Sequence, residues 1–543
     1  GCGACNVLLS KFDSNLKKVE DYTVSSCLTL LCSINGCSIT TTEGLGNSKD
    51  GFHSIHERFA GFHASQCGFC TPGMCVSLFS AIINAEKHDS ELTASQAEKS
   101  ISGNLCRCTG YRPIADVCKS YAGDVDMEDL GLNSFWKKGE HLDSKFHKLP
   151  FHNSKQICTY PEFLKNEFTS PMYLKHQNSS WYTPVSVNEL HTLLKSSSEK
   201  VKLVAGNTGV GYYKEVESYE KYIDLRFIPE FSKIKRTNSE IKVGATVSIS
   251  KLILTLKEER DDDDDLADDD DFSEGEMVFK KIAYHFEKIA TESVRNSGSI
   301  GGNLIMAQRQ GFPSDIATVL LAVKSKVTIM NGVKKESLTL EEFLTRPALD
   351  SKTLLLSVHI PYLKPTKNGY TDKSDIVTDS DSDTKLLFET YRASPRPLGN
   401  ALPYLNAAFF AEVSGNNVIN DIWLSFGAFG TKHAIRASTV ENYLLGKKLS
   451  VGLLHKAVKL IRDSVQPKDG TSHMAYRSSL AVSFLFEFLV PLVHGSDKNI
   501  NGFINHGETK TLLSSSKQVM ESSQDHYPVG EPIIKSGAAI QAS

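Results

Sequence analysis

The chain has 543 residues, of which 40% are hydrophobic and 23% are charged, and its formal net charge is −4. This length predicts about three to five domains, and the composition is typical of a soluble globular protein. Nine aspartates in residues 261–271 account for more than the whole negative charge, so the rest of the chain shows no nucleic-acid-binding signature. We interpret this acidic run as a solvated loop insertion rather than an interaction tail.

No membrane span is predicted. The most apolar stretch, Leu480–Val493, contains Glu487 and Pro491 and is too short to cross a bilayer, so we expect a buried helix there. The N-terminal segment has no basic region followed by an apolar core, so it is not a signal peptide. The chain contains twelve cysteines, and in a cytoplasmic, reducing location they point to metal ligation rather than to disulfides.

The predicted elements follow the chain from a cysteine-rich start to mixed helices and strands. Eleven cysteines precede residue 120, which predicts a domain boundary near that point, followed by a polar linker. Hydrophobic periodicity predicts strands at 201–205, 241–247, 327–329, 354–360, 407–413 and 422–428, and helices at 279–290, 453–465 and 480–489.

Three of the early cysteines form an incomplete cluster motif. Cys2 and Cys5 are spaced like the second and third ligands of a plant-ferredoxin 2Fe–2S cluster, and Cys27 is the candidate fourth ligand. Gly1 and Gly3 would let backbone N–H groups approach the sulfides. The first ligand would lie five residues before Cys2, so we expect the sequence to be truncated within this motif.

A second set of four cysteines is complete. It consists of Cys67 and Cys70 in CGFC, and of Cys106 and Cys108 in CRC. A zinc site is the alternative to a 2Fe–2S cluster, but a C-x-C pair is poor geometry for a zinc knuckle, and a disulfide is less expected in a reducing compartment. The remaining cysteines are expected to be small buried hydrophobic residues, namely Cys32, Cys37, Cys75, Cys118 and Cys158.

Two of these strings carry a family resemblance. SQCGFCTPGM at 65–74 and GNLCRCTGYRPI at 103–114 resemble the second-cluster motifs of the molybdenum hydroxylases, the xanthine dehydrogenase and aldehyde oxidase family. The N-terminal GCGAC resembles the end of that family's first-cluster motif. The resemblance implies a ferredoxin-like first domain, a four-helix second-cluster domain, and a Gln66 side chain that faces a molybdenum cofactor.

Two glycine-containing loops predict a dinucleotide site. KLVAGNTGVG at 202–211 follows a predicted strand and contains G-x-x-G-x-G, which does not support a Rossmann nicotinamide fold. The second loop is SIGGN at 299–303. Rows of backbone N–H groups in both loops could clamp a pyrophosphate, although each loop alone could equally be a tight turn.

Both loops resemble the FAD loops of the same family's vanillyl-alcohol-oxidase-type flavin domain. By this resemblance, Asp315 accepts hydrogen bonds from FAD, Leu355 packs near its adenine or ribose, and Ile289 packs against the cofactor. The spacing from Asn303 to Asp315 is longer than in xanthine dehydrogenases. The loop residues that would hold the pyrophosphate and ribose are Leu203, Val204, Ala205, Gly206, Asn207, Thr208, Gly209, Val210, Ser299, Ile300, Gly301, Gly302 and Asn303.

The sequence therefore predicts an α+β multidomain chain with a partial ferredoxin-like β-grasp, a four-helix 2Fe–2S domain, an FAD domain and an α+β flavoprotein C-terminal domain. The predicted ranges are 1–45 for the first cluster domain, 46–122 for the second, 123–172 for a linker, 173–365 for the FAD domain, 385–493 for the flavoprotein C-terminal domain, 494–525 for a linker and 526–543 for the start of a molybdenum-cofactor domain.

The segment EEFLTRPALDS at 341–351 lacks the tyrosine by which xanthine dehydrogenases dock NAD. This departure favours an oxidase that passes electrons to O2, and EEFLTRPALD at 341–350 with MAQRQGFPSDIATVLLA at 306–322 resembles plant aldehyde oxidases most closely. The resemblance implies an oxidoreductase that passes electrons from molybdenum through two 2Fe–2S clusters to FAD and O2. It also implies an aldehyde substrate, a cytoplasmic homodimer, and no membrane or nucleic-acid partner. The alternatives are an NAD-linked xanthine dehydrogenase type, a separate iron–sulfur flavoprotein subunit, and an inactive truncated gene product.

Overall fold

The computed structural model describes most of the chain. Its described residues are 1–13, 17–125, 130, 160–166, 172–195, 200–214, 218–258, 270–350, 352–364, 384–396, 398–399, 401–493, 524–526 and 535–543, with the side chains of 270–274 left out. The acidic run and the linkers predicted at 123–172 and 494–525 lie largely outside these residues.

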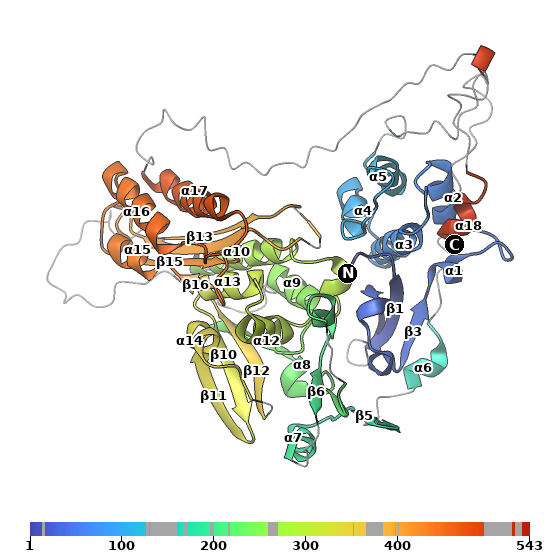
Figure 1. Cartoon of the computed structure of the whole chain (residues 1–543), viewed down its shortest axis with the longest axis horizontal. Helices are drawn as coiled ribbons and strands as arrows, with labels where there is room; N and C mark the ends of the chain where they lie inside the picture. The colour runs from blue at the N-terminus through green and yellow to red at the C-terminus, as the bar shows by residue number, and fades with distance from the viewer. Residues whose placement is uncertain are drawn as a thin grey trace.

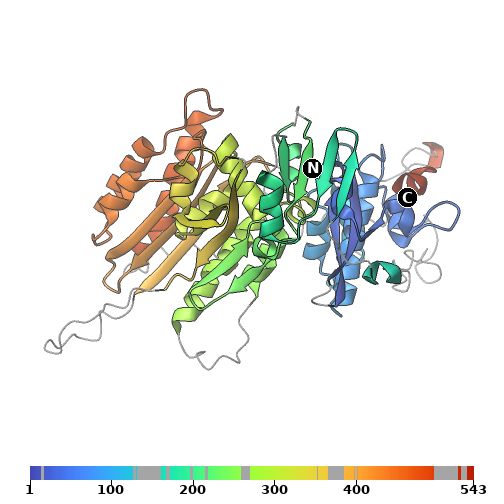
Figure 2. The same cartoon turned by 90° about the horizontal axis from the view of Figure 1, so that it is seen from below.

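The described elements form three modules, which we call N-terminal (residues 1–125), central (172–364) and C-terminal (384–493). The central module lies between the other two in both views (Figure 1 and Figure 2). The helix α18 (Ala538–Ala542) lies far from the C-terminal module, on helices α2 and α3 of the N-terminal module. The Thr42 hydroxyl fixes it there by donating a hydrogen bond to the Ala542 carbonyl (2.6 Å).

The N-terminal module combines a small antiparallel sheet with a group of helices. The sheet has the order β2-β1-β3, and α3 packs across β1. The short helix α1 follows the sheet, and the next four helices, α2 to α5, lie in the range expected for the four-helix second-cluster domain. Helix α3 has a proline in its first turn, where the missing N–H costs nothing. The elements are β1 (Asn6–Asp13), β2 (Lys18–Ser25), β3 (Cys37–Thr40), α1 (Thr42–Leu45), α2 (Ser54–Gly61), α3 (Thr71–Lys87), α4 (Ala94–Ser100) and α5 (Arg112–Lys119).

The central module contains two sheets. A four-stranded sheet has the order β4-β5-β7-β6, in which β7 runs parallel to both neighbours, and an antiparallel five-stranded sheet has the order β11-β10-β12-β9-β8. The strands are β4 (Tyr173–His176), β5 (Ser179–Tyr182), β6 (Val201–Val204), β7 (Lys221–Asp224), β8 (Ile234–Arg236), β9 (Glu240–Gly244), β10 (Lys326–Asn331), β11 (Lys334–Thr339) and β12 (Thr353–Pro361).

Helices pack between and around these two sheets and share one large apolar core with the five-stranded sheet. They are α7 (Val187–Lys195), α8 (Pro229–Ser232), α9 (Ile249–Lys257), α10 (Asp270–Phe286), α11 (Glu292–Arg295), α12 (Ile300–Gln310), α13 (Asp315–Ala322) and α14 (Leu340–Thr345), and α6 (Glu162–Asn166) precedes the module.

The C-terminal module is an antiparallel sheet of order β13-β14-β15-β16 with three helices. All nine residues of β14 are buried, because alternate side chains enter different cores. Ala408 and Phe410 join the core of the central module, whereas Leu405, Ala407 and Phe409 join a second core with the helices. The elements are β13 (Lys385–Ala393), β14 (Leu405–Val413), β15 (Ile419–Gly427), β16 (Ile435–Arg436), α15 (Ser438–Leu444), α16 (Val451–Ser464) and α17 (Met474–Val493).

The last helix of this module is longer than its sequence pattern predicts. α17 begins at Met474, spans 20 residues, and meets the length and apolarity of a membrane-crossing helix. The prediction that this segment is too short to cross a bilayer was therefore wrong. Ala481, Leu485 and Phe488 on one face of α17 pack in the core against β14, as predicted for a buried helix.

Predicted strands match β6, β9, β10, β12, β14 and β15 to within a few residues at each end. The helix predicted at 279–290 ends at Phe286, and Ala290 has a left-handed backbone (φ 51°) that cannot continue a helix. That turn redirects the chain toward the site described below.

Candidate redox cofactor sites

The complete cysteine set comes together at the N-terminal end of α3. Cys70 is the N-cap residue of α3, and Gly68 supplies the left-handed turn (φ +83°) between Cys67 and Cys70. Cys106 and Cys108 lie in the loop before α5. The four thiols form two pairs within hydrogen-bonding reach, Cys67 with Cys108 and Cys70 with Cys106.

This pairing fits a 2Fe–2S cluster better than a single metal ion. Each iron of such a cluster takes two of the four cysteine ligands, whereas tetrahedral zinc needs all four thiolates around one point. The pairing of the thiols therefore favours the cluster over the zinc alternative.

The surroundings of these thiols differ in polarity. Burial raises the pKa of the Cys70 thiol to about 12. Burial also acts to raise the pKa of Cys106, but hydrogen bonds from Thr109, whose hydroxyl oxygen lies 3.2 Å from the Cys106 sulfur, lower it overall. Such hydrogen bonds to sulfur are among the factors that set the potential of a bound cluster.

The three cysteines of the incomplete motif also converge. The Cys5 and Cys27 thiols lie within hydrogen-bonding reach, and Cys2 is close enough to influence Cys27 electrostatically. Gly3 has a left-handed backbone (φ +80°), and a Cβ there would lie 2.7 Å from the Asn104 amide nitrogen. A larger residue at position 3 would therefore push this loop away from its neighbour.

The two cysteine loops are in direct contact. The Leu105 backbone N–H, next to Cys106, donates to the Cys2 carbonyl (2.8 Å), and the Asn104 side-chain amide donates to the Gly3 carbonyl (3.0 Å). Gly73 in α3 leaves room for the same Gly3 carbonyl, which a Cβ would strike. The two cluster sites are thus joined by hydrogen bonds through their ligand segments.

A cavity of about 1610 Å³ lies in the central module, at its boundary with the N-terminal module. It is larger than the roughly 300–1,000 Å³ of a drug-sized ligand pocket, as an extended dinucleotide requires. Ile289, Asp315 and Leu355 line it, together with every residue predicted for the two glycine loops except Ile300. The Ile300 side chain is instead fully buried in the core, so it was wrongly assigned to the cofactor surface.

The first glycine loop, between β6 and the short 3-10 helix Thr208–Gly211, presents its backbone to the cavity. Asn207 has a left-handed backbone (φ 57°), and in the described part of the chain the N–H groups of Gly206, Asn207, Thr208 and Gly209 donate to no protein acceptor. Consecutive free N–H groups form an anion-binding concavity. This loop therefore fits a pyrophosphate as predicted.

The second glycine loop differs from the prediction. Its N–H groups are already bonded, from Ile300 to the Val247 carbonyl (3.0 Å), from Gly301 to the Ala245 carbonyl (2.9 Å) and from Gly302 to the Ser299 hydroxyl oxygen (3.0 Å). The predicted row of free N–H groups is absent from residues 300–302. The Ser299 hydroxyl and the Asn303 side-chain amide remain there as possible donors to a ligand.

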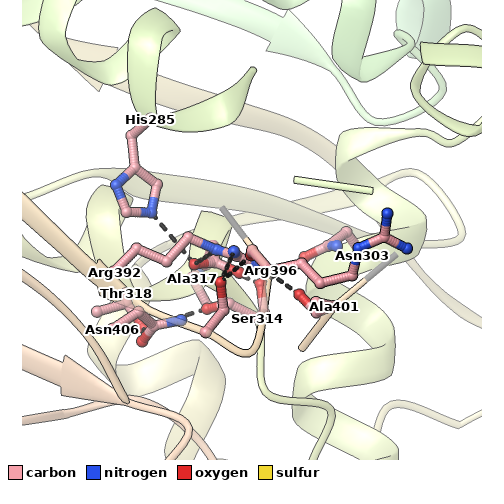
Figure 3. Close-up of polar contacts among 11 residues, drawn as sticks. His285, Asn303, Ser314, Ala317, Thr318, Arg392, Arg396, Ala401 and Asn406 are labelled. Carbon is pink, nitrogen blue, oxygen red and sulfur yellow. Dashed lines mark hydrogen bonds and ion pairs between the residues drawn. The ribbon is translucent and has the colours of Figure 1, made fainter. Parts of the chain in front are cut away.

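A buried ionic network borders the cavity behind this loop (Figure 3). Asp315 at the start of α13 accepts from the Arg392 Nε (3.1 Å) and lies 3.2 Å from the His285 Nε2. Burial alone would raise the pKa of Asp315, but the His285 hydrogen bond and the Arg392 charge hold it below its usual value. Asp315 thus positions Arg392 besides being available to FAD.

Arg392, Arg396 and His285 were missed by the sequence analysis. Arg392 lines the cavity from the end of β13 and Arg396 from the segment after it, and the strands β10 to β12 separate both residues from the glycine loops in the chain. Their only sequence signal was two arginines in the string YRASPR, which no periodicity or motif connects to a flavin site.

The first cysteine loop reaches the same cavity. Cys2, Leu28 and Leu105 contribute to its lining, and the Asn207 side-chain amide donates to the Leu28 carbonyl (3.1 Å). The loop with the free N–H groups is therefore tied to the segment that carries Cys27.

Gln66 is next to Cys67 of the complete cysteine set and does not line the flavin cavity. It is exposed, its carbonyl accepts a hydrogen bond from the Lys535 ammonium, and Gln541 packs beside Gly68. Its predicted orientation toward a molybdenum cofactor stays a prediction. Cys75 and Cys118 are buried as expected, but Cys32 and Cys37 are only half-buried, and Cys158 lies outside the described residues.

Comparisons with known proteins agree with this organisation. Residues 41–119 match the family described as a 2Fe-2S binding domain, 175–363 the FAD binding domain in molybdopterin dehydrogenase, and 389–492 the CO dehydrogenase flavoprotein C-terminal domain. The whole chain is 52% identical to an indole-3-acetaldehyde oxidase and 51% identical to abscisic-aldehyde oxidase, both from Arabidopsis thaliana, and covers 40% of each. The chain is homologous to the plant aldehyde oxidases.

An indole-3-acetaldehyde oxidase of Zea mays is similar over the same extent, with 49% identity across the whole chain and 40% of the maize protein. The chain thus spans about two fifths of the length of these relatives. Quinoline 2-oxidoreductase from Pseudomonas putida 86 aligns over 59% of this chain and 99% of its own chain, with 18% identity and a TM-score of 0.44, which is too low to support an argument.

The homology agrees with the composition of the cavity wall. In the segment where xanthine dehydrogenases carry their nicotinamide-docking tyrosine, residues 341–345 belong to α14 and residues 346–350 form the turn that follows it. Ala348, Leu349 and Asp350 of this turn line the cavity, and none of them offers an aromatic ring to a nicotinamide.

Proposed function

We propose that this chain is the electron-transfer portion of an aldehyde oxidase and holds two 2Fe–2S clusters and one FAD. The observation that carries the proposal is the position of Cys2. Its carbonyl accepts the N–H of Leu105, next to the ligand Cys106, and Cys2 itself lines the cavity with the glycine loops. All three cofactor sites are therefore contiguous.

When bound, the clusters carry single electrons and FAD exchanges electrons with O2. The residues of this chain supply binding, orientation and burial. Cys67, Cys70, Cys106 and Cys108 hold one cluster, and Cys2, Cys5 and Cys27 serve the other. The free N–H groups of 206–209 bind the pyrophosphate, while Ser299 and Asn303 add side-chain donors.

For the whole protein we propose the conversion of an aldehyde, water and O2 to a carboxylic acid and hydrogen peroxide. The relatives named for indole-3-acetaldehyde and abscisic aldehyde support an aldehyde substrate. Lys535 and Gln541 belong to the segment predicted to begin the molybdenum-cofactor domain, and they lie beside Gln66 and Gly68. This position supports entry of electrons from a molybdenum domain at that side of the complete cysteine set. We further propose a cytoplasmic homodimer that acts without a membrane or a nucleic-acid partner.

Iron and flavin content, together with anaerobic reduction, test the proposal. The chain should bind FAD and at least the complete-set cluster. After reduction with dithionite, the cluster absorbance should return far faster on mixing with O2 when FAD is bound than when it is absent. Equal reoxidation rates with and without FAD would contradict an electron-transfer role.

Cys106→Ser provides the matched control. It replaces a soft thiolate by a hydroxyl that is a poor iron ligand, so the variant should lose about half or more of the iron while keeping its flavin. Unchanged iron would reject Cys106 as a ligand. NADH should be a poor donor to the flavin of either protein, because the segment 341–351 carries no tyrosine for docking a nicotinamide.

A further inference from the structure

A second contact joins the flavin cavity to the complete set of four cysteines without involving the first cysteine loop. Arg396, which lines the cavity, places its Nη2 3.4 Å from the hydroxyl of Tyr111 in the N-terminal module, with its guanidinium carbon 5.9 Å from the centre of the Tyr111 ring. The same hydroxyl accepts the backbone N–H of Cys106 (3.0 Å). One tyrosine thus connects a cavity residue to a cluster ligand.

Tyr111 is held in place by its own backbone. It has a left-handed conformation (φ 68°) at the N-cap of α5, and its N–H donates to the Thr109 hydroxyl (3.1 Å), which also lies beside the Cys106 sulfur. A bulky residue adopts such a conformation only where surrounding contacts enforce it. The tyrosine is therefore fixed with its hydroxyl at the cluster loop.

Arg396 is held from the other side by the ionic network of the cavity. The Arg396 carbonyl accepts from the Ser394 hydroxyl, Arg392 donates from Nη1 to the same hydroxyl oxygen (2.8 Å), and Arg392 in turn is paired with Asp315. Gly399 in this loop packs against the Ser102 carbonyl, a contact that a Cβ would tighten to 3.1 Å. The loop is thus anchored in the central module and seated on the N-terminal module.

We propose that Arg396 is a positioning residue that, through Tyr111, orients the Cys106 loop and raises the reduction potential of the complete-set cluster. The inference rests on the proposed function only in taking these four cysteines as cluster ligands. A cluster becomes more negative on reduction, so a nearby cation stabilises its reduced form. The Tyr111 hydroxyl supplies the fixed hydrogen bond that keeps the ligand loop in one orientation.

Redox titration of the FAD-loaded chain tests this, with the cluster followed by visible absorbance and by the electron paramagnetic resonance of its reduced form. Arg396→Gln should lower the cluster potential, so that the reduced-to-oxidised ratio at a fixed potential falls about tenfold, or about 59 mV for one electron. Arg396→Lys keeps the charge and should restore most of the shift. Tyr111→Phe should lower the potential and alter the resonance signal.

Arg309→Gln is the matched control, because Arg309 also lines the cavity from α12 but has no recorded contact with the N-terminal module in the described part of the chain. It should leave the cluster potential unchanged. Equal shifts in Arg396→Gln and Arg309→Gln, or no shift in Arg396→Gln, would overturn the proposal.

If the Arg396→Gln variant loses iron, the Tyr111→Phe variant tests the connection instead, because it removes only one oxygen atom. An unchanged potential and signal in that variant would reject the connection. The titration uses dithionite and soluble mediators and requires no electron transfer to O2. A failure of the proposed function therefore cannot be mistaken for a failure of this inference.

Discussion

The two glycine loops of the flavin cavity have similar sequences but use their backbones in opposite ways. Residues 206–209 leave their N–H groups free in the described structure, whereas residues 300–302 give theirs to Val247, Ala245 and Ser299. Gly301 is required because a Cβ there would lie 2.5 Å from the Ala245 carbonyl oxygen. A glycine-rich string can therefore mark close backbone packing as readily as anion binding.

If contacts with the surrounding residues hold the second glycine loop in place, removing the Asp315 charge behind it should have the largest effect on stability. Ser314 binds Asn303 of this loop, and the next residue, Asp315, pairs with Arg392, with each side chain only 4% exposed. Asp315→Asn should lower the free energy of unfolding by about 3 kcal/mol at neutral pH, since it leaves a buried arginine uncompensated. Chemical denaturation at pH 7 measures this loss.

The same pair has a definite pH dependence. Because the pKa of Asp315 in the folded chain lies below its ordinary value of 3.8, its stabilisation is fully present above that value and is lost as the pH falls through the folded pKa. The difference between wild type and Asp315→Asn should therefore shrink below about pH 4. A difference that is constant down to acid pH would show that charge is not involved.

Gly206→Ala tests the first loop at its most crowded point. A Cβ at Gly206 would collide with the Ser297 carbonyl oxygen, so the backbone that carries the free N–H groups must move. Overpacking of this kind costs about 2 kcal/mol, which predicts a roughly thirtyfold weaker FAD affinity and a lower melting temperature. Flavin fluorescence titration measures the affinity, and an unchanged Kd would mean that this backbone does not contact the cofactor.

Gly302→Val separates cofactor contact from folding. A Cβ at Gly302 would meet only the Ser299 hydroxyl oxygen (2.9 Å), and the residue lines the cavity. Flavin affinity should fall about tenfold, corresponding to roughly 1.4 kcal/mol, with little change in melting temperature. Gly452→Val, in the first turn of α16 with no neighbour within 4 Å, is the control and should bind FAD normally.

Ser299→Ala should have the smallest effect. It removes the N-cap of α12 at a cost of about 1 kcal/mol, and it also removes one of the few side-chain donors of the second loop. Ser450→Ala removes the corresponding cap of α16, where Ser450 accepts from Leu453. Both variants should melt at lower temperature, but only Ser299→Ala should weaken FAD. Equal flavin binding in the two would assign Ser299 to capping alone.

Local patterns predicted much of this molecule. The spacing within each cysteine pair identified the four thiols that meet at α3, because spacing within a pair is a local property, and apolar runs identified β12 and β14. The partners of Asp315 could not be predicted in the same way. Arg392 and His285 meet Asp315 across 77 and 30 residues of chain, through tertiary packing that no short string encodes.

The prediction of free N–H groups in the second glycine loop was wrong for a related reason. Free and bonded N–H groups differ only in what lies opposite the loop, and the acceptors of Ala245 and Val247 come from the segment after β9. Ile300 was assigned to the cofactor site with the whole loop 299–303 by the family resemblance, whereas the first turn of α12 places its side chain in the core.

The double burial of β14 has a consequence for protein engineering. Ala408 and Phe410 complete the core of the central module, and the odd-numbered side chains complete that of the C-terminal module. The two modules therefore share one interior wall and should unfold in a single transition. A chimera that takes its C-terminal module from a relative must also take α10 and α13, because a foreign strand would present mismatched volumes to a core it did not evolve with.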